Sequence, residues 1–415
     1  MPAKKMGRRT FVHRSAAAGA GVWAALPLSR VLGANDRLRL GLIGAGSRGQ
    51  DLLSQLLRQP NVELVAVADV YSRRFDEVRA TVPAVRTFKD HRALLDQKDV
   101  DAVIVASPLH CHARHFLDTI AAGKDLYAEK TMTWSIAEAE ACRTAAQGSS
   151  RVIQIGLQHV STGAFADARQ WIKEGRVGKV TAVESWMSRN TPHGHGQWVR
   201  AVPSDCTADH VDWSAFLNGR PARPFDPFAF INWRLFWEFS GGNVTENMVH
   251  QLSFIMGLLD LPLPVAAAMS GGVFSEKDGR EVPDTIAVTL EFPDLVVTWQ
   301  STFSNSHFGL GERVLGSDGT IERLSGATDM VTGRLMSGVH YWPESANRPD
   351  GGVATGRAAE QDHMANFLDC VRARRQPNAP VELGYRTAVA AHMANLAYRL
   401  RRRVTLGEAT AATGQ

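Results

Sequence analysis

The chain has little cysteine, with four cysteines in 415 residues. No two of Cys111, Cys142, Cys206 and Cys370 have the short spacing typical of a metal-ligand pair. Four cysteines in a chain of this length also make no disulfide framework. We therefore interpret them as buried or incidental residues, and the sequence predicts no metal site.

The main part of the chain also lacks an excess of positive charge. The formal net charge is +4, but residues 1–34 contain lysines and arginines and no acidic residue, so the remainder is slightly acidic. A nucleic-acid-binding domain needs a basic face on its folded part. The charge distribution therefore excludes nucleic acid as the expected partner.

The first 34 residues lack a hydrophobic run long enough to span a bilayer, which takes about 20 residues. The shorter apolar run Ala16–Leu28 follows Arg8-Arg9-Thr10. A basic start before a short apolar run is typical of a signal peptide, and paired arginines resemble a twin-arginine signal. We expect residues 1–34 to engage the Tat export machinery and to place the protein in the periplasm or elsewhere outside the cytoplasm. An uncleaved, membrane-anchored form stays open.

A glycine triplet follows the first strand pattern, at residues 37–43, and precedes a helical pattern at 50–58. In this position the triplet is typical of a dinucleotide-binding turn. Its first glycine permits the tight turn, its second admits the pyrophosphate, and its third lets the helix pack closely. The residues expected to bind the cofactor here are Gly44, Ala45, Gly46, Ser47, Arg48 and Gly49.

Asp69 ends the second strand pattern, residues 62–68, about 20 residues after the glycine turn. An acid at this place accepts hydrogen bonds from the adenosine ribose and repels a 2′-phosphate, which favours NAD. Arg73 and Arg74 follow closely and leave NADP open. We expect a tightly bound cofactor, because an exported enzyme has little access to free NAD.

Further strand patterns at 101–106, 124–130 and 151–156 alternate with helical patterns, as in a doubly wound parallel sheet. Ligands of such sheets bind at the carboxyl ends of the strands. The residues at or just after these ends are Pro108, His112, Lys130 and Gln158.

The second half of the chain is rich in strand patterns. Apolar residues alternate along 286–292, a Pro-Asp turn follows, and the alternation resumes along 295–303. This is the pattern of a hairpin with one buried face. We expect an α/β protein: a Rossmann doubly wound parallel sheet at 35–158, then an α+β domain at 159–405 with a large, mostly antiparallel open sheet, and a tail at 406–415. The open sheet needs helices or a partner subunit to cover it.

Half of the ten tryptophans lie between residues 186 and 237. Aromatic rings stack on the apolar faces of sugars, so we expect at least one to line a sugar site and the others to pack in the core or an interface. These tryptophans are Trp186, Trp198, Trp213, Trp233 and Trp237. The neighbouring His193-Gly194-His195 loop, with Asp205, Cys206 and His210, holds metal-capable groups, but we interpret it as a flexible substrate loop.

These motifs together resemble the Gfo/Idh/MocA oxidoreductases, the family of glucose–fructose oxidoreductase and inositol dehydrogenase, over nearly all of the chain after residue 34. Gly44-Ala45-Gly46 matches the fingerprint of that family, and Ser107-Pro108 through His112 is similar to its Thr-Pro-x-x-x-His turn. Glu129-Lys130 is similar to its Glu-Lys-Pro segment, whose lysine lies by the nicotinamide. The resemblance implies that Ser107 and Glu129 also bind the cofactor.

The resemblance continues through the second half. The segments that carry it are Asp212-Trp213 with Gly219-Arg220-Pro221, Trp233-Arg234 through Trp237, Gly241-Gly242 with His250, and His363 through Leu368. There are two departures: Thr131 replaces the proline of the family, and Glu246 replaces the aspartate four residues before its catalytic histidine. The resemblance implies that the open sheet is an oligomer interface, in a homodimer or homotetramer.

The resemblance also implies a catalytic set. His250 would be the base, because its ordinary pKa of about 6.5 lies near working pH. Glu246 would share a helix face with His250 and orient its ring. Lys130 would stabilise the developing alkoxide or share the proton. The residues expected to bind the substrate are Lys130, Trp186, Arg234, Trp237 and His250.

The implied function is an NAD(P)-dependent oxidoreductase that transfers hydride between nicotinamide and a secondary alcohol of a sugar, sugar derivative or cyclitol. Two alternatives stay open. One is a glycosidase or lyase that retains NAD and acts by transient oxidation of a glycoside. The other is a redox-silent sugar-binding protein.

Overall fold

The computed structural model describes residues 37–191, 195–328, 335–344 and 352–412. The expected signal peptide at 1–34 lies outside the described residues, as do His193 and Gly194 of the expected substrate loop. No helix among the described residues is long and apolar enough to cross a membrane.

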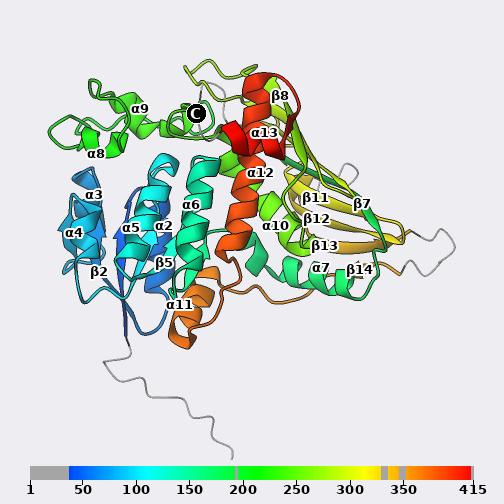
Figure 1. Cartoon of the computed structure of the whole chain (residues 1–415), viewed down its shortest axis with the longest axis horizontal. Coiled ribbons are helices and arrows are strands. Elements are labelled where there is room, and N and C mark those ends of the chain that lie inside the picture. The colour runs from blue at the N-terminus through cyan, green and yellow to red at the C-terminus, as the bar shows by residue number, and fades with distance from the viewer. Residues whose placement is uncertain (1–36, 192–194, 329–334, 345–351, 413–415) are drawn as a thin grey trace, which may run out of the picture. The chain divides into compact units, whose positions relative to one another are not determined.

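The first sheet has six parallel strands in the order β3-β2-β1-β4-β5-β6. The expected doubly wound Rossmann sheet is thus confirmed. Its strands are β1 (Leu38–Ile43), β2 (Val62–Ala68), β3 (Arg86–Phe88), β4 (Ala102–Val105), β5 (Asp125–Ala128) and β6 (Ile153–Ile155). Its helices are α2 (Ser47–Leu57), α3 (Arg73–Arg79), α4 (His91–Leu95), α5 (His112–Ala121) and α6 (Ile136–Gln147). Figure 1 shows these elements in blue to cyan.

The second sheet has nine strands in the order β14-β13-β12-β11-β7-β10-β9-β8-β15. Only β7 and β10 pair in parallel among its described strands, so the expected antiparallel character is confirmed. The strands are β7 (Val180–Ser188), β8 (Ala266–Gly272), β9 (Thr285–Glu291), β10 (Val296–Thr302), β11 (Leu310–Gly316), β12 (Gly319–Thr328), β13 (Leu335–Pro343), β14 (Ala354–Thr355) and β15 (Val404–Thr405).

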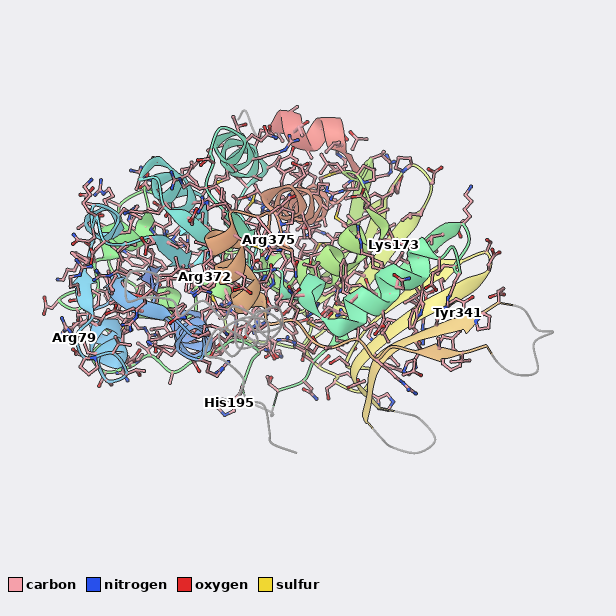
Figure 2. The ribbon with its side chains drawn as sticks, turned by 90° about the horizontal axis from the view of Figure 1, so that it is seen from below. Arg79, Lys173, His195, Tyr341, Arg372 and Arg375 are labelled. Atoms are coloured by element: carbon pink, nitrogen blue, oxygen red, sulfur yellow. The ribbon has the colours of Figure 1, made fainter. Side chains whose placement is uncertain are left out.

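Helices cover one face of this second sheet: α7 (Gly163–Lys173), α10 (Val249–Leu259) and α12 (Val381–Leu400). In the β9–β10 hairpin the apolar positions, such as Val288 and Trp299, are buried, as their alternation predicts. The Trp299 indole donates to Gln251 of α10 at 2.6 Å. Figure 2 shows α7, with Lys173, beside β13, with Tyr341, whose hydroxyl donates to the carbonyl just after α7.

Helix α11 (His363–Ala373) returns from the second half of the chain to the first sheet. Its apolar side chains join the buried cluster of β1, β2 and α2, and the Phe367 ring meets the Tyr127 ring of β5 at 5.7 Å. Arg372, labelled in Figure 2, donates to the carbonyl of Pro60 in the loop after α2. The first core is therefore built from both ends of the chain.

Several shorter elements lie between the main helices and strands. They are the helices α8 (Trp213–Leu217) and α9 (Pro227–Ile231), the 3-10 turns Leu109–Cys111, Gln158–Ser161 and Trp233–Leu235, and the π-helix Val244–Met248. Residues 406–411, expected to begin a tail, form helix α13 (Leu406–Ala411), which buries Ala409. All four cysteines are free and buried, as expected.

Candidate active site

The glycine turn between β1 and α2 has the geometry that its three glycines predict. Gly44 has a φ of 88°, and a Cβ there would lie 2.5 Å from the backbone nitrogen of Ser107. A Cβ on Gly49 would lie 2.2 Å from the Gly44 carbonyl oxygen. A Cβ on Gly46, by contrast, would meet nothing within 4 Å. Gly44 and Gly49 thus let the turn close, and Gly46 leaves open space where a ligand backbone can approach.

Asp69, at the end of β2, points back at this turn. Its carboxylate accepts from the backbone N–H of Ala45 at 2.7 Å and of Tyr71 at 2.9 Å. Burial raises the pKa of the Asp69 carboxyl, and these hydrogen bonds oppose the rise. The charge of Arg74 also lowers the pKa of Asp69. Both nearby arginines pair with other carboxylates, Arg73 with Glu77 and Asp205, and Arg74 with Glu77.

A cavity of about 490 Å³ lies at the carboxyl ends of the first sheet, against segments from the second half of the chain. Most of the residues expected to bind the cofactor line it, and Ala45 and Gly49 support the turn from behind. The expected residues in the lining are Gly44, Gly46, Ser47, Arg48, Asp69, Ser107, Pro108, His112, Glu129, Lys130, Gln158, Arg234, Glu246 and His250. Residues far apart in sequence therefore meet at one site.

Two of these residues hold the strand ends together. Arg48 of α2 pairs with Glu129, just after β5, at 2.8 Å. The His112 ring lies between two carbonyl oxygens, with Nδ1 2.7 Å from that of Thr131 and Nε2 2.8 Å from that of Ser107. His112 therefore fixes the backbone beside Lys130 and at the end of β4. The Lys130–Thr131 peptide is cis.

The π-helix Val244–Met248 supplies the opposite wall. Its carbonyls at 245 and 246 accept hydrogen bonds from outside the helix: the Thr131 hydroxyl donates to Thr245 at 2.6 Å and Lys130 Nζ to Glu246 at 2.8 Å. π-Helical turns are rare and are frequent at functional sites. This π-helical turn therefore contacts the first half of the chain at Thr131, the residue that stands where the similar family has a proline.

The Glu246 carboxylate faces two cations. Arg234 Nε donates to it at 2.9 Å, and Lys130 Nζ lies 3.7 Å away. Burial opposes its ionisation, but Lys130 and Arg234 outweigh burial and lower the pKa of the carboxyl. The expected orientation of His250 by Glu246 is therefore corrected: the carboxylate contacts cations instead. The reason is local, because a π-helical turn separates the two residues and the i, i+4 alignment of an α-helix does not hold across it.

His250 is the second residue of α10 and reaches the cavity beside Lys130. Its Nδ1 atom is buried and has no hydrogen-bond partner among the described residues. Its ring lies 5.1 Å from the ring of His159. Burial, with further contributions from Lys130 and His159, holds the pKa of His250 well below 6.5. The imidazole is therefore neutral at pH 7, free to accept a proton but a weaker base than an exposed histidine.

Lys130 carries an ammonium group in a nearly closed site. Its side chain is 12% exposed. Burial lowers the pKa of Lys130, and the neighbouring Glu246 opposes that fall. A lysine whose pKa is lowered in this way exchanges protons more readily near neutral pH than a surface lysine does.

The tryptophan expectations are met only in part. Trp198 and Trp233 line the cavity, whereas Trp186 and Trp237, expected to contact the substrate, do not. The Trp186 indole donates to the Phe308 carbonyl at 2.9 Å, on the second sheet. The Trp237 ring packs 6.0 Å from that of Tyr398. Both rings are engaged in packing away from the cavity, which sequence clustering alone could not reveal.

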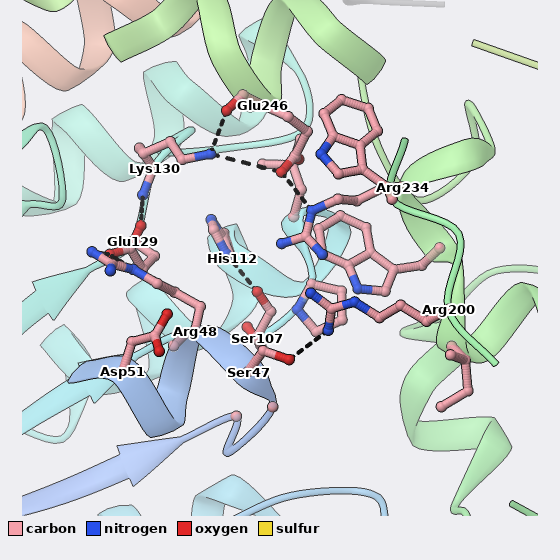
Figure 3. Close-up of a pocket in the computed structure, with 18 of the residues that line it drawn as sticks. Ser47, Arg48, Asp51, Ser107, His112, Glu129, Lys130, Arg200, Arg234 and Glu246 are labelled. Carbon is pink, nitrogen blue, oxygen red and sulfur yellow. Dashed lines mark hydrogen bonds and ion pairs between the residues drawn. The ribbon is translucent and has the colours of Figure 1, made fainter. Parts of the chain in front are cut away.

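Two lining arginines had no signal in the sequence. Arg200 bonds to the Ser47 hydroxyl across the cavity, as Figure 3 shows, and its backbone is held by the buried amide of Asn232. Arg189 follows β7 and lines the same space. Both lie in loops of ordinary composition, so only the structure reveals them.

The segment considered as a metal-capable loop is engaged in other contacts where it is described. Asp205 accepts from Tyr71 and Arg73, and the His210 ring bonds to Thr207. No group of three histidine, cysteine or acidic residues that could hold a metal occurs in the part of the chain that the structure describes.

Comparisons with known proteins agree with the two halves of this architecture. Residues 38–157 match the family model described as "Oxidoreductase family, NAD-binding Rossmann fold". Residues 216–406 match the family model described as "Oxidoreductase family, C-terminal alpha/beta domain". The solved structure of myo-inositol 2-dehydrogenase from Lactobacillus plantarum superposes with a TM-score of 0.65 and 16% identity, over 89% of this chain and 99% of that one, which is a likeness of fold.

Among curated proteins, an Inositol 2-dehydrogenase of Acidothermus cellulolyticus is 32% identical over 304 residues, covering 70% of this chain and 74% of that protein. The Inositol 2-dehydrogenase 3 of Saccharopolyspora erythraea is 32% identical over 148 residues, covering 34% and 42%. A Glycosyl hydrolase family 109 protein of Stenotrophomonas maltophilia is 36% identical over 129 residues, covering 28% of each. The chain thus matches the last two over less than half of their length.

Proposed function

Since the chain belongs to the Gfo/Idh/MocA oxidoreductase family, we propose that it transfers a hydride between NAD and a secondary alcohol of a sugar, sugar derivative or cyclitol. One observation carries the proposal: a single cavity joins the glycine turn of a Rossmann sheet to Lys130 and His250. Two relatives are inositol 2-dehydrogenases, and this similarity supports an alcohol-bearing ring as the substrate.

The residues present fit a dinucleotide. Gly46 leaves open space at the amino end of α2, where backbone N–H groups favour phosphate. Asp69 stands where ribose hydroxyls are read, and the pairing of Arg73 and Arg74 with carboxylates supports NAD over NADP. Bound NAD supplies the hydride acceptor, so the protein has to supply proton transfer, charge stabilisation and positioning.

His250 and Lys130 are suited to the proton and to the charge. The neutral imidazole of His250 accepts the proton of the substrate hydroxyl. The Lys130 ammonium stabilises the negative charge that develops on the same oxygen. Glu246 keeps Lys130 charged against the effect of burial, and Arg234 in turn orients Glu246. In this role Glu246 is a positioning residue for Lys130.

The test is purified protein with NAD and a panel of cyclitols, sugars and sugar derivatives, followed by absorbance of reduced nicotinamide and by mass spectrometry of the products. At least one alcohol should yield both reduced cofactor and the matching ketone. Binding of panel members without any oxidised product would contradict the proposal and favour a redox-silent binding protein.

The similarity to a glycosyl hydrolase family 109 protein favours one second candidate, a glycosidase that acts by transient oxidation. In that reaction NAD takes a hydride from a ring hydroxyl carbon, the neighbouring C–H becomes acidic and loses its proton as the aglycone leaves, water adds to the resulting double bond, and the hydride returns to the ketone. The same experiment separates the candidates, because this one cleaves glycosides with no net reduced cofactor.

We further propose export of the folded protein with its cofactor in place. The paired arginines and apolar run of residues 1–34 support export through the Tat machinery. Arg200, which crosses to Ser47 of the glycine turn, supports slow release of NAD. The face of the second sheet opposite the helices exposes Val296 and Gln300, and it is the surface through which we expect a homo-oligomer to form.

A further inference from the structure

The positive charges that line the cavity differ in how they are neutralised. Arg48 pairs with Glu129, Arg74 pairs with Glu77, and Lys130 and Arg234 share Glu246. Two arginines of the lining form no ion pair with a carboxylate among the residues that the structure describes. They are Arg200 and Arg189.

Arg200 has a partner of another kind, the Ser47 hydroxyl, which places it at the glycine turn. The Arg189 guanidinium has no hydrogen bond or ion pair with any residue that the structure describes. Its partial burial lowers the pKa of that guanidinium, with no anion to compensate. Burying an unpaired charge is unfavourable, so a site that keeps one is suited to an anionic ligand.

The backbone of Arg189 is fixed on both sides. Its N–H donates to the Thr302 carbonyl at 2.9 Å, and its carbonyl accepts from Asn305 at 3.1 Å. The side chain therefore starts from a rigid point at the end of β7 and lines the cavity from there. A cation on a rigid element is better suited to recognition than one on a free loop.

Arg189 belongs to the His250 end of the cavity. Gln251, the residue after His250, donates to the Trp186 carbonyl at 2.9 Å, three residues before Arg189 on the same strand segment. The charge of Arg189 also helps to depress the pKa of His250. An anion that binds Arg189 therefore belongs to the substrate, the molecule that reacts at His250. Arg200 lies at the other end of the cavity, where the glycine turn would bind the pyrophosphate.

We propose that Arg189 binds a carboxylate on the substrate, so that the protein acts on an acidic sugar or cyclitol, such as a uronic or aldonic acid. The inference rests on the proposed function. One unpaired guanidinium balances one negative charge, and its planar fork matches a carboxylate in a bidentate pair. A phosphate ester, with nearly two charges, would need a second free cation at this end of the cavity.

The pairing has a consequence for the chemistry. Once a carboxylate neutralises Arg189, one of the charges that depress the pKa of His250 is compensated, and the imidazole becomes a stronger base. An acidic substrate thus improves the base that acts on it, and a neutral sugar of the same shape does not.

The test compares acids with their neutral counterparts. Wild type and three variants, Arg189→Met, Arg189→Lys and the surface control Arg399→Met, are loaded with NAD and titrated with several uronic and aldonic acids and with the matching neutral sugars and alditols. Binding is followed by the fluorescence of Trp198 and Trp233, which line the cavity. Hydride transfer is followed separately by absorbance of reduced nicotinamide.

Wild type should bind at least one acid about tenfold or more tightly than its neutral counterpart, the usual effect of one charge-assisted pair. Arg189→Met should remove that preference, Arg189→Lys should keep part of it, and Arg399→Met should keep all of it. NAD affinity should be the same in all four proteins.

A panel in which no acid binds more tightly than its neutral partner overturns the inference, as does a preference that survives in Arg189→Met. Loss of NAD affinity in Arg189→Met also overturns it, because it would assign Arg189 to the cofactor. An acid preference without hydride transfer keeps the inference and contradicts the proposed function. Oxidation of neutral and acidic sugars alike, with no preference for the acids, keeps the proposed function and contradicts the inference about Arg189.

Discussion

The two halves of the cavity are built in different ways. The half at the glycine turn depends on backbone: Gly44 and Gly49 close the turn, Gly46 leaves room, and Asp69 accepts from two backbone N–H groups. The half at His250 depends on side-chain charge, with Lys130 and Glu246 brought together from segments more than a hundred residues apart. The first half therefore depends on close backbone packing, and the second depends on pairing between charged side chains.

This difference predicts different responses to substitution. A changed residue in the backbone half should alter NAD affinity or stability. A changed residue in the charged half should alter turnover and its pH dependence, with NAD affinity nearly unaffected. The comparison fails if either half responds in the manner of the other.

The largest expected effect is that of His250→Ala. Turnover should fall by about 10²–10⁴-fold, the usual contribution of a positioned general base. NAD affinity should stay within about twofold of wild type, since none of the groups that form the glycine turn is changed. Steady-state kinetics and equilibrium titration with NAD measure the two effects. Near-normal turnover would remove His250 from the role of base and leave Lys130 as the candidate.

The second effect separates two glycines of one turn. Gly46→Ala should fold with unchanged thermal stability, because its Cβ meets nothing within 4 Å, yet lose NAD affinity by about tenfold to a hundredfold as the methyl occupies ligand space. Gly49→Ala should instead lower the melting temperature, because its Cβ would lie 2.2 Å from a backbone oxygen. Thermal melts and NAD titration of both variants test this contrast. Similar behaviour of the two would contradict it.

Arg200→Ala gives a smaller effect and tests whether the second half of the chain helps to hold the cofactor. Its guanidinium reaches Ser47 of the glycine turn, so its loss should speed NAD release by about tenfold, the effect of one charge-assisted hydrogen bond. Stopped-flow displacement of bound NAD measures the rate, and Arg58→Ala, at the exposed C-cap of α2, is the control. An unchanged release rate would assign retention to the Rossmann domain alone.

The smallest expected effect is a shift of the pH profile in Glu246→Gln. The carboxylate favours the charged form of Lys130 against burial, so its removal lowers the pKa of Lys130 further. Activity that needs the ammonium is lost as pH rises through that pKa, and the alkaline limb should move to lower pH by about one unit. Glu184→Gln, on the exposed sheet face, is the control for kcat measured across pH. A limb that stays in place or moves upward would show that Glu246 does not act through Lys130.

The same contrast explains what the sequence could predict. The Rossmann strands and the glycine turn depend on neighbours in the chain, so periodicity and glycine spacing predicted them, and the β9–β10 hairpin followed from its alternation. The partners of Glu246 depend on a π-helical turn, which has no simple sequence pattern, and the orientation expected for His250 was wrong for that reason. Arg189 and Arg200 look like any surface arginine, and only packing places them in a cavity.

Trp186 and Trp237 make the same point from another side. The clustering of tryptophans indicated that some would line a sugar site, and Trp198 and Trp233 do line the cavity. Which ones do so depends on where β7 and the 3-10 turn at Trp233–Leu235 lie in space. The tertiary fold decides which tryptophans line the cavity, and the local composition of the sequence does not predict it.

Because helix α11 packs on the first sheet, the hydrophobic core of that sheet is completed only after most of the second half of the chain has been synthesised. The cluster around β1 and α2 includes Met364, Phe367 and Leu368, which leave the ribosome some three hundred residues after β1 and α2. Until then the nucleotide sheet has an uncovered apolar flank. The chain therefore completes its cofactor domain late, and a fragment that ends near residue 158 would contain the whole glycine motif without the packing that holds it in shape.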